Sequence, residues 1–115
     1  MSAPRLTRRM RRLVPVRVPD GAGGRTRSWE AGGAFWASVS PGGGGARVTE
    51  LGTEPRLRLR IVTQALPEGH PTRPVPGDRL AEGARLYAVD AVDPADGEGR
   101  WLTLFAREIT ERGTP

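Results

Sequence analysis

Several residue types are missing from this sequence, and each absence excludes a class of protein. The 115 residues contain no cysteine, which excludes a disulfide framework and a thiolate metal site. No apolar run approaches the roughly 18 residues that a membrane-spanning helix needs. The basic N-terminus also lacks the apolar stretch of a secretory signal. The length of 115 residues predicts a single domain, and these absences predict a soluble protein of cytoplasmic origin with no contact with a membrane.

Lysine and asparagine are absent as well, so all 18 basic residues are arginine. Together with 16 glycines and 11 prolines, this bias is typical of a GC-rich genome. Six arginines precede the first acid: Arg5, Arg8, Arg9, Arg11, Arg12 and Arg17. The other 12 of the 18 arginines face 13 acids, so the net charge of +5 comes from the N-terminal region. We interpret residues 1–12 as a flexible basic arm.

The segment from Arg56 to Val62 alternates between arginine and aliphatic residues. The aliphatic set is Leu57, Leu59 and Ile61, and the arginine set is Arg56, Arg58 and Arg60. Successive side chains of a strand point to opposite faces, so this pattern predicts a central antiparallel strand with one face on the core. The arginine face is then either solvated or directed at a polyanion such as DNA in a channel.

Other segments also have strand patterns. They are residues 13–18, a short strand ending near Trp29, residues 34–39 after a break at Gly32 and Gly33, residues 77–80, 86–92 and 101–108. Pro15 indicates an edge strand, and residues 20–24 and 93–97 have turn composition. We expect Tyr87, Val89 and Ala91 to share one face of their strand. The fold class is therefore all-β, a small antiparallel barrel or sandwich of six to seven short strands.

The closing strand has two apolar faces. One carries Leu102, Leu104 and Ala106, and the other carries Trp101, Thr103 and Phe105. The two large rings on the second face indicate either a subunit contact or a barrel that wraps both faces. Trp36 is a third candidate for a subunit interface. The domain spans residues 13–110, and residues 111–115 form a C-terminal tail.

Residues 40–55 form an unusually long connection for so small a domain. The glycine run comprises Gly42, Gly43, Gly44 and Gly45, and Arg47 follows it. Four successive glycines have low torsional barriers, so we expect a flexible loop.

No catalytic pattern is recognisable, and the sequence predicts neither an enzyme nor a cofactor. The only histidine, His70, lies in a proline-rich loop without an obvious acidic partner. The acids Asp90, Asp93, Asp96 and Glu98 lack the spacing of a calcium loop and instead suit a hairpin turn. The glycine run lacks the Lys-Ser/Thr pair of a phosphate-binding loop.

The order of these elements resembles the head–tail joining family of tailed phages, also called head-closure, stopper or head-tail adaptor proteins. The matching residues run from Leu13 to Ile109. They include the Asp20–Gly24 turn followed by Trp29, the Phe-Trp-Ala-Ser-Val segment at 35–39, the strand at 56–62, and the closing Leu-Thr-Leu-Phe-Ala-Arg-Glu at 102–108. The turn and the closing segment are most similar to versions in gene transfer agents. The family often has Gly-x-Glu after the third strand, where this chain has the glycine run.

The resemblance implies a structural neck protein of a phage-like particle, assembled in the bacterial cytoplasm. It implies a homo-oligomeric ring of about six or twelve copies, between a portal–adaptor ring and the tail terminator or tail tube. Packaged double-stranded DNA would pass through this ring, which would help to retain the DNA and dock the tail. In that setting, Arg47, Arg56, Arg58 and Arg60 are candidates to face the channel, and Gly42–Gly45 with Arg47 could form a gate. The arm arginines Arg5, Arg8, Arg9, Arg11 and Arg12 could dock to an acidic neighbour.

Two other functions remain compatible with the sequence. A stand-alone nucleic-acid-binding barrel of the OB or SH3 type would use the same arginines, although aromatic residues make up only 5% of the chain. A small enzyme or metal protein around residues 90–98 is the third alternative.

Overall fold

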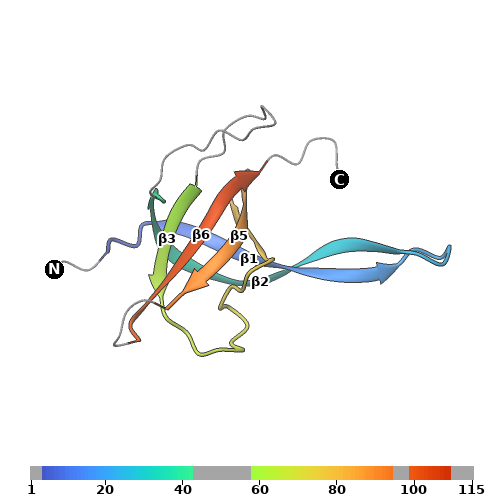
Figure 1. The fold of residues 1–115 in the computed structure, drawn as a ribbon, viewed down its shortest axis with the longest axis horizontal. Coiled ribbons are helices and arrows are strands. Elements are labelled where there is room, and N and C mark those ends of the chain that lie inside the picture. The colour runs from blue at the N-terminus through green and yellow to red at the C-terminus, as the bar shows by residue number, and fades with distance from the viewer. Residues whose placement is uncertain (1–3, 43–57, 95–98, 110–115) are drawn as a thin grey trace.

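The computed structural model describes residues 4–42, 58–94 and 99–109, and this part of the chain is all-β (Figure 1). Its strands are β1 (Arg8–Pro19), β2 (Arg25–Pro41), β3 (Arg58–Gln64), β4 (Arg79–Glu82), β5 (Arg85–Asp93) and β6 (Trp101–Ile109). They pair antiparallel in the order β1-β2-β3-β6-β5-β4, and β4 pairs with β1 to close a barrel. The predicted fold class is therefore confirmed. Within the described ranges, no helix could cross a membrane.

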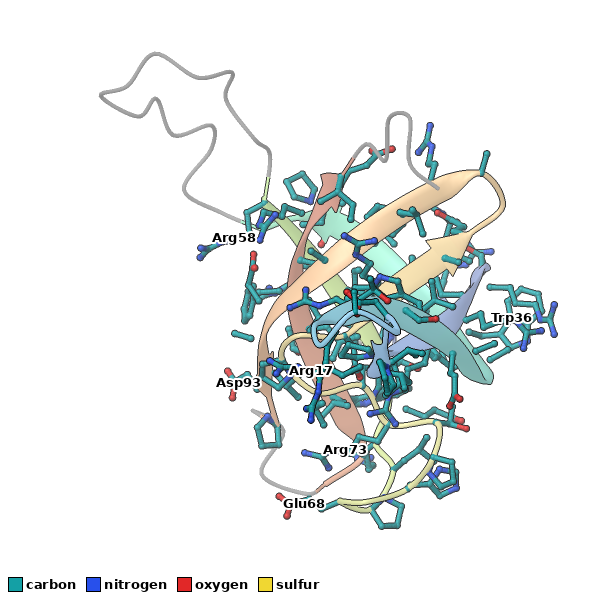
Figure 2. The ribbon with its side chains drawn as sticks, turned by 90° about the vertical axis from the view of Figure 1, so that its right-hand side faces the viewer. Arg17, Trp36, Arg58, Glu68, Arg73 and Asp93 are labelled. Atoms are coloured by element: carbon teal, nitrogen blue, oxygen red, sulfur yellow. The ribbon has the colours of Figure 1, made fainter. Side chains whose placement is uncertain are left out.

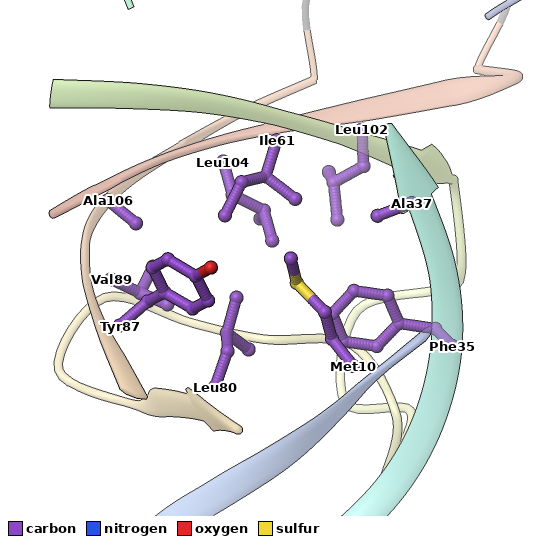
Figure 3. Close-up of a cluster of buried hydrophobic side chains, with 10 residues drawn as sticks. All are labelled: Met10, Phe35, Ala37, Ile61, Leu80, Tyr87, Val89, Leu102, Leu104 and Ala106. Carbon is purple, nitrogen blue, oxygen red and sulfur yellow. The ribbon is translucent and has the colours of Figure 1, made fainter. Parts of the chain in front are cut away.

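The core fills the barrel interior with side chains from all six strands (Figure 3). The buried hydrophobic residues are Met10, Phe35, Ala37, Ile61, Leu80, Tyr87, Val89, Leu102, Leu104 and Ala106. The alternation predicted for β3 and β6 is confirmed, because Ile61, Leu102 and Leu104 point inward while Arg58 and Arg60 are exposed. β3 lies between β2 and β6, as expected of a central strand.

One predicted face is wrong at the end of β5. Tyr87 and Val89 are buried, but Ala91 is exposed. The register shifts between Val89 and Ala91, so that Ala91 lies opposite Phe105 and Val92 lies opposite Leu104. A β-bulge inserts one extra residue and reverses the orientation of the residues that follow it. Val92 therefore packs against the core instead of Ala91.

The first strand begins earlier than the sequence pattern predicts, at Arg8 rather than Leu13. Residues 8–12 therefore belong to the barrel and do not form part of a flexible arm. Met10 is 1% exposed and lies opposite Phe35 in the ladder with β2. In residues 8–12 the only apolar residue is Met10, among four arginines, so the sequence does not show the alternation that predicts a strand.

The expected break at Gly32 and Gly33 is also absent, because β2 continues through both glycines. A Cβ added at Gly33 would lie 2.0 Å from the Thr72 Oγ1 atom, and one at Gly32 would lie 3.3 Å from the Pro71 carbonyl oxygen. These glycines allow the loop between β3 and β4 to cross closely over β2.

The β1–β2 hairpin extends far beyond the barrel (Figure 1). The last β1–β4 pair is Leu13 with Arg79, and residues 14–19 then pair only with residues 25–30. We call residues 14–30 the hairpin arm. Six residues of strand span ~20 Å. The predicted edge strand at Pro15 and the predicted turn are both present.

Asp20 organises the tip of the hairpin arm. Its Oδ1 atom accepts hydrogen bonds from the backbone N–H groups of Ala22 and Gly24, at 2.8 and 3.0 Å. Gly21 and Gly23 adopt positive φ angles of 84° and 89°, which glycine permits without steric cost.

Three of the segments predicted from the sequence fall wholly or mostly outside the described residues. They are most of the loop at residues 40–55, the tip of the predicted turn at 93–97, and the C-terminal tail at 111–115. Of the long loop, β2 includes Ser40 and Pro41, and Gly42 follows it.

Candidate assembly surfaces

The outer surface of β2, β3 and β6 brings together residues that the sequence patterns assign to two different roles. The ladders place Val62 between Ser38 and Thr103, and Arg60 between Ser40 and Phe105. Trp36 precedes Ala37, which pairs with Thr63, and the next residue, Gln64, pairs with Trp101. The interface candidates and the two channel candidates that the structure describes, Arg58 and Arg60, therefore lie on one face, which we call the outer face.

One end of the outer face is aromatic. Trp36 is 53% exposed, the largest exposed fraction among the large hydrophobic side chains in the described residues. It lines a cleft of about 310 Å³ together with Leu6, Gln64 and His70. Trp101 is half-buried. An exposed ring beside an apolar cleft is typical of a protein contact rather than of a solvated surface.

The other end of the outer face is basic. Arg58 lies opposite Arg107, and Arg60 lies opposite Phe105. The Arg60 guanidinium is 6.0 Å from the centre of the Phe105 ring, and Arg107 forms an ion pair of 3.3 Å with Asp90. Arg58 and Arg60 thus remain the exposed cations of β3, whereas Asp90 partly neutralises Arg107.

The basic end also carries the base of the glycine-rich segment. The backbone N–H of Gly42 donates to the carbonyl oxygen of Arg58 at 2.7 Å. The chain therefore leaves β2 and re-enters β3 at one point, beside the exposed arginines. The other predicted loop residues, Gly43, Gly44, Gly45, Arg47 and Arg56, lie outside the described residues.

Two of the five predicted docking arginines serve the barrel itself, and the first of them is Arg8. It donates from Nε and Nη2 to the two carboxylate oxygens of Glu82, at 2.5 and 2.9 Å. The Tyr87 hydroxyl donates to the same carboxylate at 2.8 Å. The Arg8 hydrogen bond, followed by that of Tyr87, holds the pKa of Glu82 below its usual value despite partial burial. Burial and the neighbouring carboxylate raise the pKa of Tyr87.

The second of these arginines, Arg12, holds the loop between β3 and β4. The β1–β2 register shifts between Arg11 and Leu13, and the bulge re-aims Arg12 toward the loop. Its Nε atom lies 2.6 Å from the Asp78 carboxylate, and its Nη1 atom donates to the Pro71 carbonyl at 3.0 Å. Asp78 is 2% exposed and also accepts the backbone N–H of Val75.

The other three predicted docking arginines are more available for contact with another molecule. Arg5, Arg9 and Arg11 are exposed, and Arg11 donates to the Gly32 carbonyl at 3.3 Å. Arg9 lies opposite Trp36 in the β1–β2 ladder, so it borders the aromatic end of the outer face.

The hairpin arm is a basic surface that the sequence patterns did not single out. Arg17 and Arg27 lie directly opposite each other, and Arg25 lies opposite Pro19. The guanidinium groups of Arg27 and of Arg79 in β4 lie 5.8 and 4.3 Å from the centre of the Trp29 ring. The available signal was the Arg-Thr-Arg-Ser-Trp alternation at residues 25–29.

The candidate residues for catalysis or metal binding are His70 and the acids at residues 90–98. The Nδ1 atom of His70 accepts the backbone N–H of Thr72 at 3.0 Å, as a loop-stabilising contact. Within the part of the chain that the structure describes, no three acids or histidines gather as a metal site. Asp96 and Glu98 of the considered calcium cluster lie outside that part.

Comparison with known proteins identifies the family. Residues 1–109 match the family described as phage head completion protein. The chain therefore belongs to this family, and the resemblance drawn from the sequence is confirmed.

Two solved structures have a similar fold. One is a chain in the virion of a native gene transfer agent particle, with a TM-score of 0.77 and 42% identity, covering 95% of this chain and 100% of that one. The other is a protein from Shigella flexneri 2a solved in solution, with a TM-score of 0.66 and 19% identity, covering 97% of this chain and 100% of that one. The second likeness shows the fold alone. No curated protein matches the chain.

Proposed function

We propose that this head-completion protein forms a ring in the neck of a tailed phage or gene transfer agent particle. The observation that carries the proposal is the 42% identity, over 95% of this chain, to a chain in a gene transfer agent virion. The ring would lie between the portal–adaptor complex and the tail, continue the DNA channel, help to retain packaged DNA and provide the surface on which the tail docks. Its role is structural rather than enzymatic.

The two ends of the outer face suit two different neighbours. The aromatic end, with exposed Trp36 beside an apolar cleft, suits contact with another protein ring. The basic end, with Arg58 and Arg60, suits the phosphate backbone. Repetition of two exposed guanidinium groups around an axis would produce a positive ring without any base-specific contact.

The segment after Gly42 is assigned to gating within this proposal. Its two ends meet at the basic end of the outer face, through the Gly42–Arg58 hydrogen bond. Movement of such a segment would not break the ladder hydrogen bonds of the barrel, whereas movement of a strand would. Arg47 would then add one positive charge per copy near the DNA.

Imaging the neck of intact particles that carry a tagged copy of this chain tests the proposal. We expect the tag between the portal complex and the tail, in a closed ring. A chain found only in capsid walls or tail fibres, or absent from purified particles, would contradict the neck assignment.

The channel assignment has its own test. Replacing Arg58 and Arg60 with Gln should give particles that assemble but lose DNA before tail attachment. The matched control is Arg85→Gln, because the Arg85 side chain is 60% exposed on a different strand. Deleting residues 43–45 and 47 tests the gate while keeping the Gly42–Arg58 bond. Normal DNA retention in both variants would remove the channel and gate assignments and leave the ring.

A further inference from the structure

The hairpin arm exposes a combination of apolar and basic groups that the barrel does not use. Val18 is 40% exposed on one face of the hairpin, and the cross-strand pair Pro19 and Arg25 is exposed on the other face. Arg17 lies directly opposite Arg27, and like charges at such positions destabilise a ladder. Among the residues that the structure describes, neither Arg17 nor Arg25 has an acidic partner.

A two-stranded hairpin is also marginal in water without a surface to pack on. Beyond Leu13, β1 has only β2 as a neighbour, and none of the residues 14–30 is buried. Along the valine row on β1, Val14 and Val16 are half-buried and Val18 is 40% exposed, so the row is least covered at the tip. A partner that covers the tip would remove this exposure.

A cleft of matching chemistry lies between the loop after β3 and the end of β5. Its volume is about 470 Å³, and its apolar lining includes Pro74, Val75, Pro76, Val92 and Pro94. Val75 is 42% exposed, so this cleft and the hairpin tip contain two of the three exposed large hydrophobic residues in the described ranges. We call it the proline cleft.

The rim of the proline cleft is acidic, whereas the hairpin tip carries Arg17, Arg25 and Arg27 against one acid, Asp20. Glu68 lines the cleft, and Asp93 lies between two lining residues in the sequence; both are exposed (Figure 2). Neither acid has an ion pair with the described residues. The one cation in the lining, Arg73, is tied to its own loop because its Nη1 atom donates to the Leu66 carbonyl at 2.8 Å.

The two surfaces face different directions. The hairpin arm extends to one side in Figure 1, whereas β5 ends on the opposite, lower side of the barrel near the loop at residues 65–78. One copy can therefore offer its tip while its cleft remains open. A contact between two different patches of identical subunits is heterologous, and it closes into a ring when the rotation permits.

We infer that the hairpin tip of one copy inserts into the proline cleft of the next copy and that this contact builds the ring. Val18, on one face of the inserted hairpin, contacts the proline and valine lining, while Pro19, Arg17 and Arg25, on the opposite face, lie toward Glu68 and Asp93. Insertion of one hairpin tip into a cleft of about 470 Å³ gives a small contact, which suits a subunit that associates weakly in solution and forms a stable ring when a pre-formed portal–adaptor surface aligns the copies. This inference rests on the proposed ring and names its subunit interface.

Engineered cysteines test the contact cleanly, because the chain contains none. Val18→Cys and Val75→Cys are made in separate chains, so a disulfide between them joins two molecules. Particles containing both variants are oxidised, and so is a concentrated mixture of the purified proteins. We expect a dimer that contains one chain of each kind, and chains carrying both substitutions should give a ladder of multimers. Val16→Cys on the same strand, paired with Val75→Cys, controls for position and should link less.

Charge reversal provides a second readout. Arg17→Glu with Arg25→Glu should lower incorporation into particles by about tenfold, because like charges would meet across the contact. Adding Glu68→Arg and Asp93→Arg in the same chain should restore incorporation.

The possible outcomes separate the two proposals. If the protein is present in the neck but Val18 does not link to Val75 and charge reversal is not rescued, this interface is wrong while the neck function stands. Linkage of Val18 to Val18 would indicate a symmetric hairpin contact and would also overturn the inference. If the variant with Arg17→Glu and Arg25→Glu forms rings normally but its particles lose DNA, the hairpin tip contacts DNA instead, and the inference is wrong. A chain absent from particles contradicts the neck function, and the purified mixture then decides the contact.

Discussion

The barrel and the hairpin arm are built from the same two strands but by different physical means. In the barrel, β1 and β2 contribute Met10, Phe35 and Ala37 to a closed core, and every strand has two neighbours. Beyond Leu13 the same strands pair only with each other, Trp29 lies beside Arg79 of β4, and no side chain of residues 14–30 is buried. The closed core of the barrel therefore stabilises the fold, whereas the hairpin arm is available to contact another molecule. Matched variants on the two parts can test this division.

The largest effect is expected in the barrel core. Leu104→Ala removes a side chain with 0% exposure and should lower the free energy of unfolding by about 4 kcal/mol. Val18→Ala is the matched control on the arm and should change it by less than about 0.5 kcal/mol. Urea unfolding of both variants measures the difference. Equal losses would show that the arm packs within the subunit.

The buried ion pair that holds the β3–β4 loop comes next. Asp78→Ala leaves Arg12 without its carboxylate and the Val75 N–H without its acceptor, so stability should fall by about 3 kcal/mol. Asp93→Ala, an exposed acid, is the control. Hydrogen exchange should show faster opening of residues 67–77, which line much of the proline cleft, in the first variant only. Unchanged exchange would mean that β4 alone holds the loop.

Close packing of the loop over β2 has a smaller expected effect. Gly33→Ala places a Cβ 2.0 Å from Thr72 Oγ1, so the loop must shift, at a cost of about 2 kcal/mol. Thr72→Gly should recover part of this loss in the double variant, as measured by a thermodynamic cycle. Gly24, where an added Cβ would lie 2.9 Å from the Asp20 Oδ2 atom at the tip, is the counterpart on the hairpin arm. Full additivity at Gly33 and Thr72 would exclude the clash as the cause.

The pH dependence of barrel stability follows from Glu82. Its pKa is lowered in the folded state from an ordinary value of 4.5, so the folded chain binds fewer protons than the unfolded chain between the two values. The stabilisation is therefore present above about pH 4.5 and is lost as the pH falls through the lowered pKa. Glu82→Gln should cost about 1 kcal/mol at pH 7 and flatten the acid side of the profile.

The smallest effect on stability is expected on the arm, where the effect on assembly is the largest. Arg17→Glu converts the like-charge pair with Arg27 into an opposite-charge pair, which should stabilise the chain by a few tenths of a kcal/mol. Incorporation into particles should nevertheless fall. Thermal unfolding and particle composition measure the two properties together. If Arg17→Glu lowers both thermal stability and incorporation, the hairpin arm also contributes to the stability of the fold, which would contradict its separation from the barrel.

The sequence allowed much of the fold and part of the candidate site to be predicted. The alternation in β3 and β6, the turn at Asp20, the proline-rich loop and the all-β class follow from local rules of side-chain direction and turn chemistry. The family was also recognisable from the order of these elements. The same patterns identified five surface candidates: Trp36, Trp101, Phe105, Arg58 and Arg60. They did not predict that these residues lie on one face of the barrel.

Tertiary structure decided the rest, because it depends on which strands meet. The bulges that re-aim Arg12 and expose Ala91 are register shifts between paired strands, and no single strand contains that information. The ion pairs of Arg8 and Arg12 join residues 74 and 66 positions apart, which turned two expected docking groups into barrel contacts. The arm exists only because β4 pairs with β1 at residues 11–13 and no further. The sequence determined which faces are apolar and where the chain turns, whereas strand pairing decided which of those faces remain uncovered.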